Sequence, residues 1–231
     1  MIWYFLVVFM AELQKINVIY EDNHLLVVEK PVNMPVCEDE SNDKDLLNSL
    51  KEYIKEKYNK PGNVYLGLVH RLDRPVGGVM VFAKTSKAAS RLSSQVSCHE
   101  LEKTYVAVVS GRVPDSGNMH DYLVKDKNKN MSYVTDKTNG KEARLSYKRL
   151  GYKEGFSLVE VYLETGRSHQ IRVQFSSRGF PLVGDAKYNK NHDGKTSVAL
   201  FAKRLTFKHP ISKEVLSFEL DIPDRYPFNK F

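Results

Sequence analysis

Residues 143–163 contain the pattern that decides the fold class. They read ARLSYKRL over 143–150, GYKEG over 151–155 and FSLVEVYL over 156–163. Apolar and polar residues alternate in the first segment, and branched or aromatic residues fill the last one; both patterns are typical of β-strands. A link as short as GYKEG joins neighbouring antiparallel strands, because a parallel connection needs about a dozen residues or more. The stretch therefore predicts an antiparallel hairpin.

Strand and helix signals continue on both sides of this hairpin. Further strands are predicted over residues 16–20, 25–28, 78–83, 104–109, 198–207 and 215–220, with polar loops over 126–130 and 188–196. Helices are predicted over 43–58 with Asn42 or Asp43 as cap, over 86–95 with Ser86 as cap, and over 168–177 ending near Gly179. Short links between adjacent strands imply an α+β fold, in which helices and loops flank a mainly antiparallel mixed sheet.

The chain of 231 residues is expected to form one catalytic domain over 16–231 after an extension over 1–15. The extension begins MIWYFLVVFM, which is too short to span a bilayer, since a span needs about 20 residues. It also lacks the basic start and the cleavage site of a signal peptide. Our hypothesis is that Met10 is the natural start and that residues 1–9 come from an over-extended reading frame. A short docked strand is the alternative.

The charge of the chain is concentrated in one stretch. Residues 167–208 contain nine Lys and Arg against two Asp, and the whole chain has a net charge of +7. Such a local excess is typical of proteins that bind polyanions, although lysine-rich surfaces also occur without nucleic acid. Cys37 and Cys98 have neither metal-ligand spacing nor a disulfide framework, and no Gly-rich phosphate loop is present. We therefore expect a cytoplasmic protein that binds no metal.

A charged cluster precedes the strand over 78–83. Residues 70–73 read HRLD and residues 74–84 read RPVGGVMVFAK. Proline and glycine after Asp73 force an irregular backbone, so this carboxylate is expected on a loop held between strands. Arg71 and Arg74 flank it, and nearby cations stabilise the ionised form of a carboxylate, which suits a nucleophile or a base. A simple loop salt bridge is the alternative interpretation.

Two other segments combine basic, aromatic and amide side chains. GRSHQIRVQF over 166–175 places Arg167, His169, Gln170 and Arg172 at a helix start, where anions are favoured. Ile171 and Phe175 are expected to face the core and to direct those four outward; a solvated helix face is the alternative. In EKTYVAVVSG over 102–111, Tyr105 lies on a strand and could stack on a base, although strand tyrosines more often serve packing.

Together these segments resemble the RluA-type pseudouridine synthases from about residue 18 to residue 223. VVEKP over 27–31 resembles the opening segment of that family, and residues 70–84 resemble the motif that holds its catalytic Asp. KTY over 103–105 looks like its tyrosine motif. Residues 166–173 and the segment from Gly184 through Asp185 to Tyr188 look like its basic motif and the segment after it. The order and spacing of five short motifs carry the resemblance.

The resemblance implies isomerisation of uridine in ribosomal or transfer RNA by a monomer, without cofactor or metal. Asp73 would be the essential carboxylate, as nucleophile or as base, and the sequence leaves both roles open. Tyr105 would pack against the target base, and Arg172 would pair with Asp73 as the third catalytic residue. Arg71 would fill the space that the flipped base leaves. The other expected RNA contacts are His70, Lys103, Arg167, His169 and Gln170.

The sequence departs from the family pattern without losing a proposed catalytic residue. PVGG over 75–78 replaces the usual Asp-Thr-Ser-Gly, and Gln174 stands where His is usual. A catalytically silent RNA-binding or ribosome-assembly factor on the same fold is the alternative function. A glycoside hydrolase ranks last, because it needs two carboxylates that flank the bond and only Asp73 has a convincing context.

Overall fold

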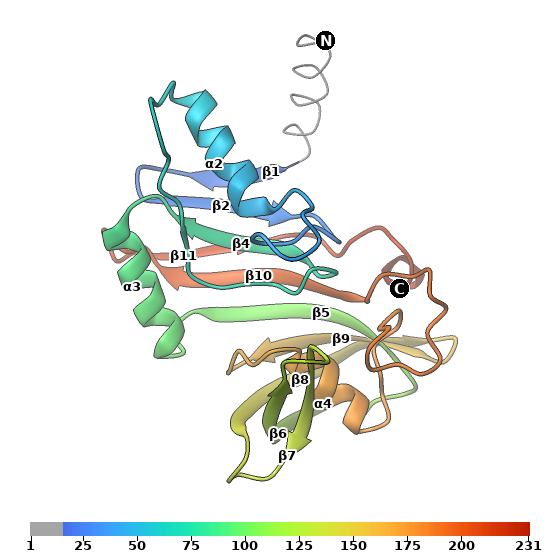
Figure 1. Cartoon of the computed structure of the whole chain (residues 1–231). Helices are drawn as coiled ribbons and strands as arrows, with labels where there is room; N and C mark the ends of the chain where they lie inside the picture. Colours follow the sequence, from blue (N-terminus) through green and yellow to red (C-terminus); the bar gives the residue numbers. More distant parts are fainter. Residues whose placement is uncertain (1–15) are drawn as a thin grey trace. The chain divides into compact units, whose positions relative to one another are not determined.

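The computed structural model describes residues 16–231, so the proposed start at Met10 lies outside the described residues. The described chain forms two compact units (Figure 1). The first unit consists of residues 16–101 and 207–218, and the second of residues 102–206 and 219–231. Each unit is described on its own below, and the single catalytic domain over 16–231 stays a prediction.

The first unit contains three antiparallel neighbours in the order β1 (Asn17–Glu21), β2 (Leu25–Lys30) and β4 (Gly77–Ala83). The two-residue strand β3 (Gly67–Leu68) pairs with the end of β4. Strands β2 and β4 consist mostly of apolar residues, and all of β4 is buried. A strand that is buried on both faces shows no alternation of polar and apolar residues. Helix α2 (Leu46–Lys57) follows β2 in the chain, and α3 (Ser86–Ser97) packs against β3 and β4.

Both helix caps in the first unit differ from the predicted ones. The carboxylate of Asp45 caps α2 by accepting from the backbone N–H of Asn48, whereas Asn42 or Asp43 was predicted. Asp43 instead accepts hydrogen bonds from the side chains of Ser41 in its own loop and Arg74 in another loop, so its carboxylate does not cap the helix. Thr85 caps α3, one residue before the predicted Ser86. In both cases several polar residues compete for the helix start, and the sequence alone does not decide between them.

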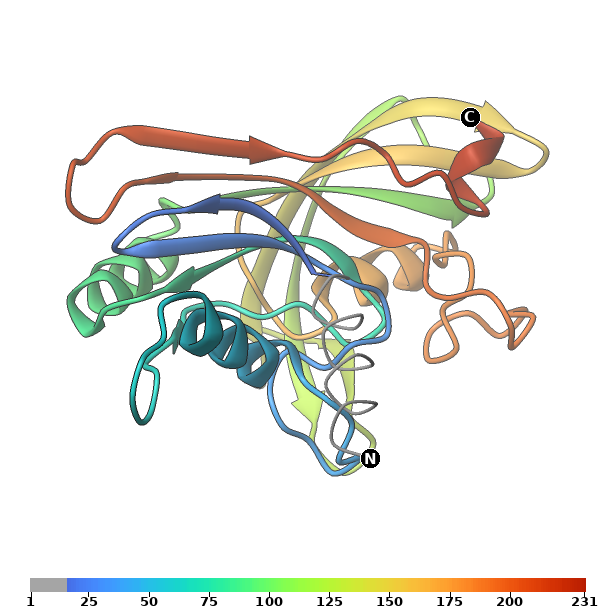
Figure 2. The same ribbon diagram turned by 90° about the horizontal axis from the view of Figure 1, so that it is seen from above.

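The second unit is built on a sheet in the order β10-β5-β9-β8-β6-β7, in which all neighbours are antiparallel. The bounds are β5 (Glu102–Ser110), β6 (Ser116–Asp126), β7 (Met131–Thr135), β8 (Lys141–Lys153), β9 (Phe156–Leu163) and β10 (Leu200–Lys208). The hairpin predicted from residues 143–163 is confirmed as β8–β9, whose long strands are visible in Figure 2. The β6–β7 hairpin was not predicted, because its charged residues hide the strand pattern.

Helix α4 (Gln170–Ser177) packs against β6 and β7 in the second unit (Figure 1). Its Phe175 ring lies 5.2 Å from the ring of Tyr147 in β8. A separate core cluster joins β5, β9 and β10 to the C-terminal turn η1 (Phe228–Lys230); its buried members are Val106, Val108, Leu158, Val183, Ala199, Phe201 and Phe228. The chain returns to the first unit at the end of β10 and in most of β11 (Val215–Glu219). The predicted α+β class with mainly antiparallel pairing is confirmed.

Candidate active site

The loop that carries Asp73 is fixed to the first unit on several sides. A turn forms where the N–H of Val76 donates to the carbonyl of Asp73 over 2.9 Å. The ring of His70 accepts the N–H of Val81 through Nε2 at 3.1 Å, which ties the loop to β4. A Cβ on Gly77 would lie 3.1 Å from the carbonyl oxygen of Lys30, so the backbone there approaches more closely than most residues allow. Asp73 itself is half-buried, and its position is therefore well defined.

A buried lysine lies beneath this loop. The ammonium of Lys30 donates to the carbonyls of Pro31 at 2.9 Å, Arg74 at 3.0 Å and Val76 at 2.8 Å. The side chain is 1% exposed. Burial lowers the pKa of Lys30 to about 7, against the opposing effect of the negative charge on Asp73. Sequence reasoning missed this residue as part of the site, although a lysine that ends the apolar run LLVVEK was a usable signal.

Arg74, which follows Asp73 in the sequence, contacts carboxylates on another loop of the first unit. Its guanidinium contacts the acidic segment over 33–43, with Nη1 3.7 Å from Asp39 and Nη2 bonded to Asp43. The hydrogen bond from Arg74 lowers the pKa of the Asp43 carboxyl. Lys30 is a further cation near Asp73, since the negative charge of Asp73 raises the pKa of Lys30 against the effect of burial, and the sequence interpretation did not include it. Arg71 is exposed, as an RNA contact requires.

In the second unit, Lys103 and Tyr105 lie on the same face of β5, since alternate strand residues share a face. Tyr105 is 7% exposed and lies opposite Val161 of β9. Burial lowers the pKa of Lys103. A Cβ on Gly166 would be 3.2 Å from the ammonium of Lys103, so this side chain reaches the loop before α4. The structure thus brings the tyrosine motif to the basic motif within one unit.

The expectation that the polar residues of the basic motif point outward is wrong for His169, Gln170 and Arg172, which are buried, whereas Arg167 is half-buried. Gln170 is 3% exposed, and its amide is used inside the protein. Its Oε1 accepts from Thr165 Oγ1 at 2.8 Å and from the N–H of Arg167 at 3.0 Å, while Nε2 donates to the carbonyl of Arg144 at 3.0 Å. These bonds stabilise the start of α4, so the geometry favours a structural role for Gln170 over an RNA contact.

His169 and Arg167 are also held by neighbouring groups. His169 is the N-cap residue of α4 in the left-handed conformation, with φ of 54°, and is 8% exposed. Its Nδ1 lies 2.8 Å from the hydroxyl of Tyr188. The Nε of Arg167 donates to the carbonyl of Glu142 over 2.8 Å. Because the polar groups at the start of α4 are hydrogen-bonded inside the protein, this helix can be enclosed on most sides. It is therefore more buried than an amphipathic helix with one face in solvent.

Arg172 forms a two-point ion pair inside the second unit. Its Nε and Nη2 donate to the two carboxylate oxygens of Asp185 at 2.8 and 2.6 Å, and both side chains are at most 4% exposed. The guanidinium also lies over the ring of Tyr188, 5.2 Å from its centroid. A guanidinium has five N–H donors, so a second acceptor is compatible with this pair. The predicted Asp73–Arg172 pair joins residues of two units and stays a prediction.

The basic stretch over 167–208 is partly neutralised by residues outside it. Four of its cations contact carboxylates from elsewhere in their own unit: Arg178–Asp121, Lys203–Glu160, Arg204–Glu219 and Lys208–Glu100. Arg172 is paired with Asp185 within the stretch. The sequence excess of +7 therefore overstates the local charge of the folded stretch, because strand pairing brings acidic residues next to it.

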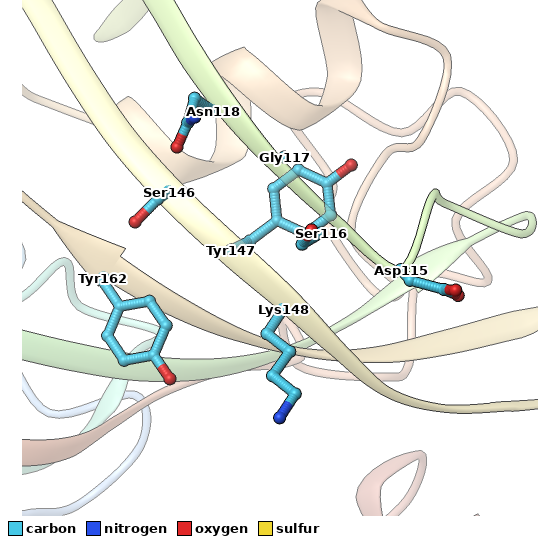
Figure 3. Close-up of a pocket in the computed structure, with 8 residues that line it drawn as sticks. All are labelled: Asp115, Ser116, Gly117, Asn118, Ser146, Tyr147, Lys148 and Tyr162. Atoms are coloured by element: carbon cyan, nitrogen blue, oxygen red, sulfur yellow. The ribbon is translucent and has the colours of Figure 1, made fainter.

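A shallow cavity of about 480 Å³ lies on the second unit between β6, β8 and β9 (Figure 3). Its lining residues are Asp115, Ser116, Gly117, Asn118, Ser146, Tyr147, Lys148 and Tyr162, and none of them is a predicted site residue. Tyr162 follows Val161 in β9, so its side chain points to the opposite face from Tyr105. Tyr147, another lining residue, lies opposite Val161 and packs against Phe175 of α4, so the lining of the cavity includes side chains from both faces of the sheet.

Neither a metal centre nor a membrane span is found within residues 16–231. In this part of the chain no three His, Cys, Asp or Glu side chains are grouped so that they could hold a metal ion. None of its helices is both long enough and apolar enough to cross a bilayer.

Comparison with known proteins identifies the class. Residues 24–177 match the family model described as RNA pseudouridylate synthase, and this range includes Asp73, Tyr105 and Arg172. The chain belongs to this family. Its members are RNA pseudouridine synthases, which are isomerases, so the family and enzyme class expected from the motifs are confirmed.

Individual relatives resemble nearly the whole chain. Ribosomal large subunit pseudouridine synthase D of Zymomonas mobilis is 34% identical over 90% of this chain and 69% of the relative. The protein of the same name from Neisseria meningitidis is 36% identical over 94% of this chain and 60% of the relative, so the chain spans about two thirds of these proteins. Human RNA Pseudouridylate Synthase Domain Containing 4 shares the fold, with a TM-score of 0.78, 22% identity and coverage of 96% and 94%.

Proposed function

We propose that the protein isomerises uridine to pseudouridine in ribosomal RNA, with Asp73 as the catalytic carboxylate. The observation that carries this proposal is the support of the Asp73 loop. The fully buried ammonium of Lys30 donates to three carbonyl groups, and two of these, from Arg74 and Val76, belong to the loop that carries the half-buried Asp73. Burying a cation is costly, so such an arrangement favours a fixed carboxylate over a casual salt bridge. The names of the relatives point to ribosomal RNA as substrate.

The proposed reaction conserves all atoms. The N1–C1′ glycosidic bond breaks, the base turns, and a C5–C1′ bond forms. The C5 proton is lost to a base, and N1 ends with a proton. Asp73 would act either as nucleophile at C1′ or as the base, because a carboxylate can do both. Substrate and product are isomers, so no external electron or group donor enters the reaction.

The remaining site residues receive roles in the same proposal. Tyr105 packs against the target base, and Arg172 orients Asp73 through donors beyond its pair with Asp185. Arg71 fills the place of the flipped base, which its exposure allows. His70, Lys103 and Arg167 contact the surrounding RNA. We further propose that the protein acts as a monomer in the cytoplasm, without metal or cofactor.

The test uses unmodified ribosomal RNA transcribed with uridine that carries tritium at C5. Wild-type protein should release tritium to water in proportion to the pseudouridine formed. Asp73→Asn should release it at background rate, because Asn keeps the shape but is neither nucleophile nor base. Glu56→Gln is the matched control, since it removes an exposed carboxylate on α2 of the same unit.

Two outcomes would contradict the proposal. Retention of a tenth or more of the wild-type rate by Asp73→Asn would remove Asp73 from its role. Pseudouridine maps of total RNA that are the same with and without the gene would favour the silent RNA-binding factor instead.

A further inference from the structure

The segment over residues 185–188 contacts several parts of the second unit at once. Asp185 is fully buried and binds the guanidinium of Arg172 through both carboxylate oxygens. The same carboxylate accepts the backbone N–H groups of Lys187 at 3.0 Å and Tyr188 at 3.2 Å. The conformation of the segment is therefore set by the residue that holds Arg172.

The other end of this segment is bonded to the β6–β7 hairpin. The ammonium of Lys187 donates to the carbonyl of Asn130 in the hairpin turn, over 2.6 Å. The hydroxyl of Tyr188 accepts the N–H of Ser132 in β7, over 2.7 Å. Ser176 of α4 donates to the carbonyl of Tyr188 at 2.8 Å. The segment is thus tied to both the hairpin and α4.

Tyr188 has two separate sets of contacts. Its ring lies beneath the guanidinium of Arg172, as described above, and packs against Leu123 and Val173. Its hydroxyl accepts from Ser132, so the hydroxyl proton can be donated to Nδ1 of His169 at 2.8 Å. The ring therefore contacts Arg172, and the hydroxyl forms hydrogen bonds with the hairpin and with His169.

The hairpin has a surface suited to single-stranded RNA. Lys125, Lys127 and Lys129 are exposed at or next to its turn, and the ring of Tyr133 is 39% exposed on β7. On single-strand binding surfaces, cations bind phosphates and exposed aromatic rings stack on bases. A change in the hairpin position would therefore change RNA affinity.

We propose that residues 185–188 couple RNA contact at the β6–β7 hairpin to the position of Arg172, with Tyr188 as the positioning residue. This inference rests on the proposed function. The hydroxyl of Tyr188 fixes the position of the β6–β7 hairpin and therefore affects RNA binding. The ring of Tyr188 and the carboxylate of Asp185 fix the position of the Arg172 guanidinium and therefore affect turnover.

Two variants of Tyr188 separate these effects. Tyr188→Phe keeps the ring and removes the hydroxyl, so KM should rise about fivefold to tenfold, the effect of one or two lost neutral hydrogen bonds, while kcat stays near wild type. Tyr188→Leu also removes the ring, and kcat should fall roughly a hundredfold, as small misplacements of catalytic groups do. The matched control is Tyr162→Phe, which removes a hydroxyl bonded to Glu160 on the opposite face.

Amide hydrogen exchange gives a readout that does not need activity. Tyr188→Phe should speed exchange at Ser132, whose N–H loses its acceptor, and Tyr162→Phe should not. Unchanged exchange at Ser132 would overturn the inference, whether or not the protein is active. The inference would also be overturned if kcat and KM changed together in both Tyr188 variants, because a merely structural role of Tyr188 would produce that result. A wild-type protein without activity but with the expected exchange would contradict the proposed function alone.

Discussion

Replacement of Lys30 by Met tests whether a buried cation supports the Asp73 loop. Met keeps most of the length and apolar volume of the side chain but has no charge and no donor. The carbonyl of Val76 lies in a buried environment and loses its donor, which costs about 1–3 kcal/mol. The carbonyls of Pro31 and Arg74 are only partly buried, so water can replace part of their bonds. We expect Lys30→Met to be less stable than wild type at neutral pH.

The size of this loss should depend on pH. Burial lowers the pKa of Lys30 from its ordinary 10.5 to about 7. The unfolded chain then holds more protons than the folded protein between pH 7 and pH 10.5, so wild-type stability rises with pH across this window. From pH 7 to pH 9 the gain is about 3 kcal/mol, at about 1.4 kcal/mol for each pH unit. Lys30→Met lacks this gain.

Urea unfolding at pH 6 and pH 9 measures both quantities. The difference in unfolding free energy between wild type and Lys30→Met should be small at pH 6 and larger by about 3 kcal/mol at pH 9. Lys87→Met is the control, since Lys87 is an exposed lysine on α3 of the same unit. A difference that stays constant from pH 6 to pH 9 would refute the argument that burial of the ammonium controls the stability of this loop.

Three further predictions concern the second unit and RNA binding. Arg172→Lys should reduce single-turnover rate by roughly a hundredfold while RNA affinity changes little, because Lys keeps the charge but loses the planar fork that holds Asp185. A wild-type rate would contradict it. Gly184→Ala should cost more than about 3 kcal/mol, measured by urea unfolding, because φ is +72° and the new Cβ would lie 2.6 Å from the carbonyl of Ser197. Gly179→Ala, with φ of +83° and open space, should cost only about 1–2 kcal/mol. RNA affinity should fall with salt at a slope clearly shallower than the value of about −6 that nine phosphate contacts would give; a slope of −6 would show that paired cations also bind phosphate.

The fold was predictable where one periodic pattern dominates a segment. The β8–β9 hairpin, strands β1, β2 and β4 of the first unit and the α4 region follow from alternation, apolar runs and helical spacing. The β6–β7 hairpin was missed because lysines and aspartates surround its few apolar residues, and its pairing is fixed by neighbouring β8. Helix caps were misplaced by one to three residues, because side-chain partners elsewhere decide which polar residue is available.

The candidate site was predictable in its residues but not in their contacts. Motif order located Asp73, Tyr105 and Arg172, and the family match covers all three. The sequence did not show that Lys30 supports the Asp73 loop or that Asp185 holds Arg172. Both partners stand in motif segments of the sequence, but motif order does not show which side chains of different segments are in contact. Gln170 looked like a surface residue because amides are usually exposed.

Two arginines of the charged motifs are each paired with carboxylates of their own unit. Arg74, next to Asp73 in sequence, is held by Asp39 and Asp43, and Arg172 is held by Asp185. A buried ion pair adds little to stability, since desolvation offsets the attraction, but it fixes the direction of the donors. Such an arginine contributes geometry more than net charge, because its own carboxylate neutralises it. If Arg172 orients Asp73 as proposed, turnover depends on the direction of its guanidinium donors, and Asp185, which sets that direction, matters for turnover as much as Arg172 does.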